Sequence, residues 1–222
     1  MSKTARLDEL VTVVNDKIVV NKDSSKPYLS LEHLPSRGAY IKGFSASTES
    51  TSTNSIFEKG DVLFGKLRPN LRKAVLAPFD GYCSTDILVL RARESIHSRF
   101  AGRVFQSEHI GAAAERTAIG TKMPRTSWHQ LKEERVFVPP FPEQQIVAQI
   151  LDTLDTQIRQ TEVLITKLER IKQGLLTDLF THGIDQNGQL RPTPDQAPHL
   201  YKDSPFGLIP EVWQSGSVED FC

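Results

Sequence analysis

The feature that most constrains this sequence is a heptad repeat across residues 143–180. Apolar side chains recur there at alternating steps of four and three residues for about four and a half repeats, which places them on one face of a long α-helix. The segment has no proline and one glycine, so nothing in it predicts a break. At 1.5 Å per residue the helix would be roughly 57 Å long. Its apolar stripe comprises Val147, Leu151, Leu154, Ile158, Ile165, Leu168, Leu175 and Leu179.

An apolar stripe of this length must be covered by another helix, because burying apolar area is the main gain in such packing. The remainder of the sequence contains no second heptad segment of comparable length. We therefore expect the covering helix to come from another chain.

Residues 1–142 predict a small mixed α/β domain. Residues 98–116 have apolar positions at helical spacing and predict one or two helices that break near Gly111. Residues 128–134 predict a short helix capped by Thr126 or Ser127. The runs that predict strands are residues 10–20, 28–31, 61–67, 73–77, 85–91 and 135–138. The cluster between residues 61 and 91 predicts a compact, largely antiparallel sheet.

Three other segments predict irregular structure. Residues 46–55 contain no aliphatic side chain beyond alanine and predict an exposed loop. Two consecutive prolines, Pro139 and Pro140, end the domain because neither can donate a backbone hydrogen bond. Residues 181–222 predict an extended acidic linker whose last part, residues 217–221, repeats the acid pattern of residues 6–10 like the start of a second repeat. The predicted fold class is α+β, a small mixed α/β domain followed by one long coiled-coil helix.

Charge is distributed unevenly along the chain, although its formal net charge is zero. Residues 1–142 hold 21 Lys and Arg against 15 Asp and Glu, whereas residues 143–180 hold 4 against 6 and residues 181–222 hold 2 against 6. Proteins that bind nucleic acids neutralise phosphates with basic side chains. The basic excess therefore indicates a polyanion contact in the first segment.

Composition and motifs argue against an enzyme. The histidines are scattered without an HExxH pair, and the two cysteines, Cys83 and Cys222, form neither a disulfide framework nor a zinc site. The sequence has no phosphate-binding loop, nucleophile elbow or dinucleotide motif. We therefore expect no catalytic residue, no metal and no cofactor.

The chain is also predicted to lie in the cytoplasm. No run approaches the roughly 20 apolar residues that cross a bilayer. Residues 1–10 lack the basic start and apolar stretch of a secretory signal. We therefore expect no membrane partner.

Four stretches of the sequence resemble the specificity subunits of type I restriction-modification systems. They are GDVLFGKLRP at residues 60–69, GTKMPR at 120–125, VPPFPEQQ at 138–145 and FGLIPEVW at 206–213. The third is similar to the family's exit from a recognition domain into its conserved helix, and the fourth to the segment that opens a recognition domain. The third and fourth at this spacing are the most specific.

The resemblance implies a non-catalytic subunit that reads double-stranded DNA in a bacterial or archaeal cytoplasm. Family members usually carry two recognition domains joined by two antiparallel helices, and each domain reads one half of a split target. They dock partner subunits that methylate adenine and cleave DNA. This sequence has one such domain and one helix, so we expect a half-length subunit that forms a homodimer through residues 143–180 and reads a palindromic split target. A fragment of a longer gene product is the alternative.

Two basic clusters are the candidate DNA contacts. Four cations flank the turn at Pro69 without an intervening acid, which favours phosphate contact, and three more lie in a segment rich in Thr and Gly that lets a loop approach a groove. Arginine binds guanine bidentately and asparagine binds adenine, so Asn70, Arg116 and Arg125 are the candidates for base reading. Arg37 is a further, weaker candidate. The complete set is Arg37, Lys66, Arg68, Asn70, Arg72, Lys73, Arg116, Lys122 and Arg125.

A different class of function fits the heptad repeat equally well. The chain could be a non-enzymatic coiled-coil adaptor whose globular domain binds protein. The basic balance of residues 1–142 favours the DNA-binding interpretation. Salt-dependent binding to mixed duplex DNA would separate the two classes.

Overall fold

The structure is a computed structural model that describes residues 3–19, 26–46 and 53–216. The chain divides into two compact units, Met1–Asp155 and Thr156–Cys222. The boundary falls inside one long helix, α5 (Phe141–Thr181). The long helix predicted from the heptad repeat is thus confirmed.

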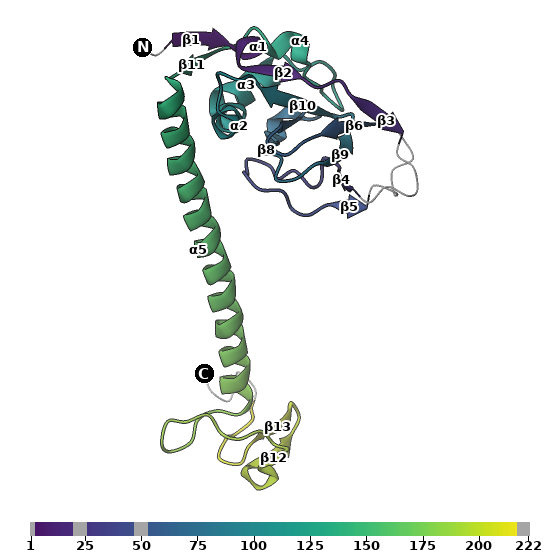
Figure 1. Cartoon of the computed structure of the whole chain (residues 1–222). Coiled ribbons are helices and arrows are strands. Elements are labelled where there is room, and N and C mark those ends of the chain that lie inside the picture. Colours follow the sequence, from purple (N-terminus) through teal and green to yellow (C-terminus); the bar gives the residue numbers. More distant parts are fainter. Residues whose placement is uncertain (1–2, 20–25, 47–52, 217–222) are drawn as a thin grey trace. The chain divides into compact units, whose positions relative to one another are not determined.

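A four-stranded antiparallel sheet lies at the centre of the first unit (Figure 1). Its order is β2 (Val11–Val13), β10 (Ile87–Ala92), β7 (Val62–Gly65) and β8 (Ala74–Leu76). Every adjacent pair in it is antiparallel. The strands predicted between residues 61 and 91 are therefore confirmed in this sheet.

A second sheet of five strands packs on the first. Its order is β3 (Lys17–Val19), β6 (Thr53–Phe57), β9 (Gly81–Ser84), β4 (Pro27–Leu29) and β5 (Ser45–Ala46). Only β4 and β9 run parallel within it. The single compact sheet of the sequence-based expectation is therefore two sheets.

The predicted loop at residues 46–55 is wrong at its C-terminal end. Thr53 to Ser55 belong to β6 and pair with both β3 and β9. Asn54 is fully buried in this strand, so it cannot enter a DNA groove. Pairing on both sides imposes the strand on a sequence with little apolar signal. Residues 47–52 of the expected loop lie outside the described residues.

Among the described residues, the unit also contains four short α-helices: α1 (Leu7–Leu10), α2 (Ser98–Gln106), α3 (Glu108–Arg116) and α4 (Trp128–Leu131). The break predicted near Gly111 occurs instead at Ser107, whose hydroxyl accepts the Ile110 N–H at 3.4 Å and caps α3. Gly111 is buried inside α3, where an added Cβ would lie 2.8 Å from Cδ of Arg72. That glycine is a point of close packing, not a helix end.

Alternation along the central strands divides the core into two layers. Val62 and Phe64 face the helices, where Phe64 meets Phe105 edge to face at 5.8 Å between centroids. Leu63 faces the second sheet and packs with Phe57. Because both faces of β7 are covered, its sequence is continuously apolar.

Strand β1 (Lys3–Arg6) pairs antiparallel with β11 (Arg135–Val138) immediately before α5 begins (Figure 1). The predicted strand and short helix of this region are confirmed, and Ser127 is the N-cap of α4. Helix α5 begins at Phe141, two residues before the predicted start. Pro142 is tolerated there because the first turn of a helix has no intrahelical partner for its backbone N–H groups.

The second unit has more regular structure than the extended linker expected after the helix. It contains η3 (Pro198–Leu200) and a hairpin of β12 (Tyr201–Ser204) and β13 (Gly207–Pro210). A turn precedes them, in which the Asp185 carboxylate accepts the backbone N–H groups of Asn187 at 2.8 Å and Gln189 at 2.9 Å. Residues 217–221, expected to resemble residues 6–10, lie outside the described residues.

Gly81, in β9, tests the packing within the five-stranded sheet, where β4 and β6 lie on either side of it. A Cβ at this position would lie 2.5 Å from the Pro27 carbonyl oxygen and 2.8 Å from a ring carbon of Phe57. We expect Gly81→Ala to lower the free energy of unfolding by about 1–3 kcal/mol through overpacking. The control is Gly174→Ala in α5, where no atom lies within 4 Å and better helix propensity should add up to about 1 kcal/mol. Thermal unfolding of both variants checks this, and equal melting temperatures would contradict it.

Candidate nucleic-acid interface

Two basic segments that are far apart in sequence are joined by backbone hydrogen bonds. The Arg68 N–H donates to the Pro124 carbonyl at 2.8 Å, and the Thr126 N–H donates to the Lys66 carbonyl at 3.1 Å. Leu67 and Arg125 form an antiparallel bridge between these bonds. The turn after β7 and the loop after α3 therefore form one surface, which we call the basic surface. Of the predicted residues it includes Lys66, Arg68, Asn70, Lys122 and Arg125.

The turn presents its polar side chains through an unusual backbone conformation. Its 3-10 turn, η2 (Pro69–Leu71), is flanked by Arg68 at φ 51° and Arg72 at φ 49°, both in the left-handed region. Such a conformation is costly for a residue with a Cβ and persists only where the surroundings fix it. Here the Arg68 N–H is bound across the surface, and Arg68 and Asn70 are exposed.

Arg72 fixes the other end of the turn from inside the molecule. Its Nε donates to Glu115 at 2.7 Å, it also pairs with Glu108, and its side chain is only 12% exposed. These hydrogen bonds raise the pKa of Arg72 and lower the pKa of Glu108. Arg72 was predicted as a phosphate contact, but its contacts are those of a residue that holds the turn against α3.

Arg37 joins the same network from the surface. Its backbone N–H donates to the Arg72 carbonyl at 3.2 Å, and its guanidinium lies 3.3 Å from Glu108. The Arg37 side chain is 61% exposed. The backbone of Arg37, like that of Arg68, adopts the left-handed conformation. This candidate, weak on sequence grounds, therefore lies next to the turn.

The two lysines that flank the turn are half-buried. The Lys73 ammonium donates to the Leu31 carbonyl, and burial lowers the pKa of Lys73. Burial likewise lowers the pKa of Lys66; the charge of Asp86 opposes this shift, and the charges of Lys17 and Arg125 act with it. Lys73 is thus held in an internal contact, whereas Lys66 lies among other cations.

The base-reading candidates differ in their surroundings. Arg125 is 49% exposed, and its Nε donates to Asp86 at 3.1 Å. Arg116 is 62% exposed but pairs at 2.7 Å with Glu134, which lies next to β11. Only Arg125 of these two arginines has its backbone joined to the turn after β7.

Sequence reasoning missed two charged residues of this surface. Lys17, in β3, is close enough to Lys66 to affect its pKa, and Asp86 is the carboxylate partner of Arg125. Asp86 also accepts the Lys66 backbone N–H through its carbonyl at 2.8 Å. The net positive charge of segment 1–142 was visible in the sequence, but these pairings depend on the fold.

The described residues offer no centre for metal chemistry, since no group of three His, Cys, Asp or Glu side chains is arranged to hold an ion. Within the same residues, no helix is both long and apolar enough to cross a membrane. Cys83 is buried, which raises the pKa of its thiol to about 12. A thiol with so high a pKa is a poor nucleophile.

A mixed α/β domain that leads into a long helix defines a known architecture. The HsdS subunit from Thermoanaerobacter tengcongensis superposes with a TM-score of 0.61 at 22% identity, covering 78% of this chain and 47% of that one. A chain from a structure titled for complex assembly and conformational transition of the type I R-M system gives 0.64 at 20% identity, covering 86% and 51%. These likenesses show the fold.

Residues 2–170 match the family model described as type I restriction modification DNA specificity domain, and the chain belongs to this family. The EcoDI specificity subunit of Escherichia coli is 26% identical over 69% of this chain. The putative MjaX specificity subunit of Methanocaldococcus jannaschii is 25% identical over 70% of it. The match covers 35% and 36% of these relatives, so the chain spans about a third of their length. Both relatives are named as specificity subunits of type I restriction enzymes.

The Arg72 network predicts a pH dependence. Because the hydrogen bond from Arg72 lowers the pKa of Glu108 below its usual 4.5, the carboxylate contributes stability that is complete above pH 4.5 and is lost as the pH falls through the lower value. We expect Glu108→Gln to be less stable than the unchanged chain at pH 7 and the difference to shrink by about pH 3. Denaturant unfolding at both pH values measures this. Glu94→Gln, at an exposed loop position, is the control, and a gap that persisted in acid would contradict the assignment.

Proposed function

We propose that this chain reads one half of a split double-stranded DNA target through the basic surface. The observation that carries the proposal is the backbone junction between the turn after β7 and the loop after α3, which gathers two basic segments. Membership of the DNA specificity family supports the same assignment. Phosphate contacts set the register of a protein on DNA, and a few side chains then read the bases.

The exposed cations at the edges of the surface suit phosphate contact. Arg37, Arg68 and Lys122 are exposed and lie on the turn, the adjoining loop or the segment bonded to the turn. The end groups of Arg68 and Lys122 can neutralise a phosphate without breaking an ion pair among the described residues, whereas Arg37 would first give up part of its contact with Glu108. Half-buried Lys73, bonded to a carbonyl, is less suited to this role.

Arg125 and Asn70 are the side chains that we assign to base reading. Arg125 can present a guanidinium to guanine bidentately, and Asn70 can present an amide to adenine. Asp86 holds the guanidinium of Arg125 in place and leaves half of the side chain exposed. A held side chain loses less rotamer entropy when it binds than a free one.

Arg125→Ala and Arg68→Ala should separate base reading from phosphate contact. We expect Arg125→Ala to relax preference at one base position at a cost of about 1–3 kcal/mol, and Arg68→Ala to weaken all sequences alike and lower the salt slope by about one. Binding to a randomised duplex library at two salt concentrations measures both effects. Lys59→Ala, at the opposite end of β7, is the control. Uniform loss in both variants would contradict the role of Arg125, and salt-insensitive or absent binding by the unchanged chain would favour the protein-binding adaptor.

We further propose that α5 pairs with a second copy of the chain. The eight stripe residues are each 36–56% exposed. Such exposure is unusual for a regular apolar face and indicates that another helix covers it in the assembled protein. A groove of about 470 Å³ continues the stripe on the first unit and includes Phe100, Val104 and Phe137.

The order of the stripe supports an antiparallel pair. Val147 and Leu179 lie equally far from Val163, as do Ile158 and Leu168. A second copy related by a two-fold axis near Val163 would therefore place Val147 opposite Leu179, Leu151 opposite Leu175 and Ile158 opposite Leu168. Two identical readers related in this way would require a palindromic target.

Ile158→Asp tests the pairing. Because Ile158 is 56% exposed in the single chain, its replacement should leave the helix folded but place a carboxylate in the pair interface. We expect light scattering to report a dimer for the unchanged chain and for the control Gln160→Asp, and a monomer for Ile158→Asp. A monomeric unchanged chain at micromolar concentration would overturn the proposal.

Docking to methyltransferase and restriction subunits is part of the same proposal. It is supported by the family and by the names of the relatives, which are parts of type I restriction enzymes. In that role the chain recognises the DNA sequence, and the partner subunits carry out methylation and cleavage.

A further inference from the structure

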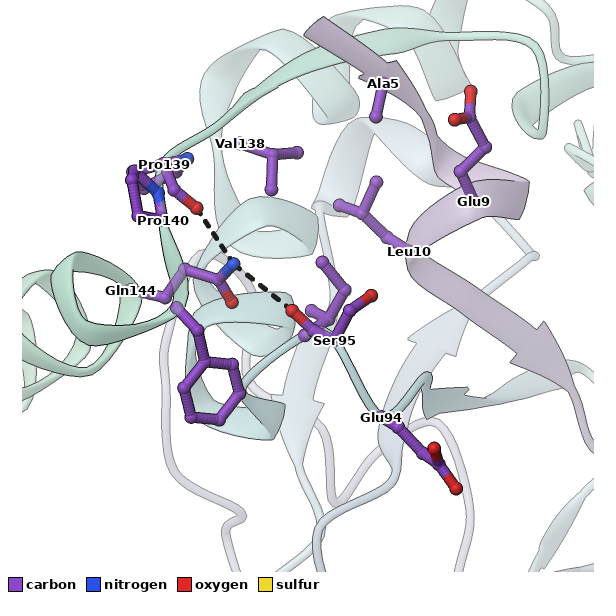
Figure 2. A pocket seen from close by; sticks show the side chains of 11 residues that line it. Ala5, Glu9, Leu10, Glu94, Ser95, Val138, Pro139, Pro140 and Gln144 are labelled. Carbon is purple, nitrogen blue, oxygen red and sulfur yellow. Dashed lines mark hydrogen bonds between the residues drawn. The ribbon is translucent and has the colours of Figure 1, made fainter. Parts of the chain in front are cut away.

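One buried side chain joins the start of α5 to the rest of the first unit. Gln144 is 2% exposed, and its amide nitrogen donates to the carbonyls of Pro139 at 3.0 Å and Ser95 at 3.4 Å (Figure 2). Its amide oxygen accepts the His97 N–H at 2.9 Å. His97 is the N-cap of α2. Both donors and the acceptor of this amide are therefore used to bind backbone from two separate segments.

A hollow interrupts the apolar packing on the other side of this junction. A hollow of about 500 Å³ lies between the exit segment, Pro139 to Phe141, and the residues Ala5 and Leu10 (Figure 2). Gln144 forms part of its wall. The first turn of α5 is held there by Phe141, whose ring meets the His97 ring edge to face at 5.9 Å between centroids, and by the hydrogen bonds of Gln144. The hydrogen bonds are the more strongly directional of these contacts.

Ion pairs hold the same face of α5 further along. Arg103 of α2 lies 2.6 Å from Asp152 and also pairs with Asp155, and its side chain is only 16% exposed. Ala148 is fully buried between Gln144 and these carboxylates. Positions 144, 148, 152 and 155 follow steps of four, four and three, so they form one face of the helix. This anchoring face is distinct from the apolar stripe that begins at Val147.

We infer that Gln144, with the Arg103 ion pairs, is a positioning residue that fixes the direction in which α5 leaves the recognition unit and thereby sets the spacing of the two half-sites. The inference rests on the proposed function. A helix of 41 residues is roughly 60 Å long, so a tilt of about 4° at one end moves the other by about 4 Å. That exceeds the rise of one base pair, about 3.4 Å. A small change in the angle at which α5 leaves the first unit would therefore allow binding to half-sites separated by a spacer of the wrong length.

The test variant is Gln144→Glu in the full chain. Glutamate keeps an acceptor for the His97 N–H but faces the carbonyls of Pro139 and Ser95 without a proton to donate. Gln145→Glu makes the same change at the next, exposed position and is the matched control. Arg103→Gln is a second variant, which removes the two ion pairs of Arg103, leaves the Arg99–Asp152 pair, and keeps the test open if Gln144→Glu fails to fold.

The readout is selection from a duplex library in which two randomised half-sites are separated by spacers of different length. We expect the unchanged chain and Gln145→Glu to select one spacer length. Gln144→Glu and Arg103→Gln should select the same half-site bases but discriminate against a spacer changed by one base pair roughly tenfold less, the scale of one or two hydrogen bonds.

Each contrary result has its own meaning. A variant that keeps the sharp spacer preference overturns the inference, as does one that loses base preference and spacer preference together, since that is loss of fold. An unchanged chain that selects half-site bases at any spacing also overturns it and leaves DNA reading intact. An unchanged chain that selects no bases overturns the proposed function and the inference with it.

Discussion

Burial of the four-stranded sheet on both faces is the constraint on which the first unit depends. Val62 and Phe64 require the helices on one side, and Leu63 requires the second sheet on the other. With both faces occupied, polar function is confined to the ends of the strands. The turn after β7 leaves the sheet at such an end, and there it meets the loop after α3. The position of the basic surface thus follows from the packing of the core on both faces of the sheet.

The sequence predicted best the elements whose signal is local. The heptad repeat of α5 and the short apolar runs of β7, β8 and β10 are visible in neighbouring residues alone, so the sequence was enough to identify them. Strands β6 and β9 carry polar or small residues and owe their conformation to neighbours across the sheet. The helix break was misplaced for a related reason. Gly111 makes room for the Arg72 side chain, which is distant in sequence, and it does not end a helix.

The sequence was enough to predict which residue types would form the candidate site, but not how these residues would be arranged in space. Lys66, Arg68 and Arg125 were each visible as cations near turns, yet only backbone bonds between segments bring them together. Which cations meet solvent was not predictable either. Arg72 and Lys73 belong to the same run as Arg68, but their end groups contact Glu115 and a backbone carbonyl. Such contacts depend on tertiary structure, which a basic cluster in a sequence does not specify.

If Arg125 reads bases as proposed, its pairing with Asp86 has a consequence for the time that the chain spends on wrong DNA sites. On any duplex, the guanidinium must give up part of its contact with the carboxylate, and only a base edge of matching geometry returns an equivalent bond. Asp86 also repels phosphate wherever the match is absent. Both effects shorten residence on random sequence, where counterion release alone would hold the protein. In the proposed role, an acidic residue among basic ones would therefore shorten the search for the target sequence.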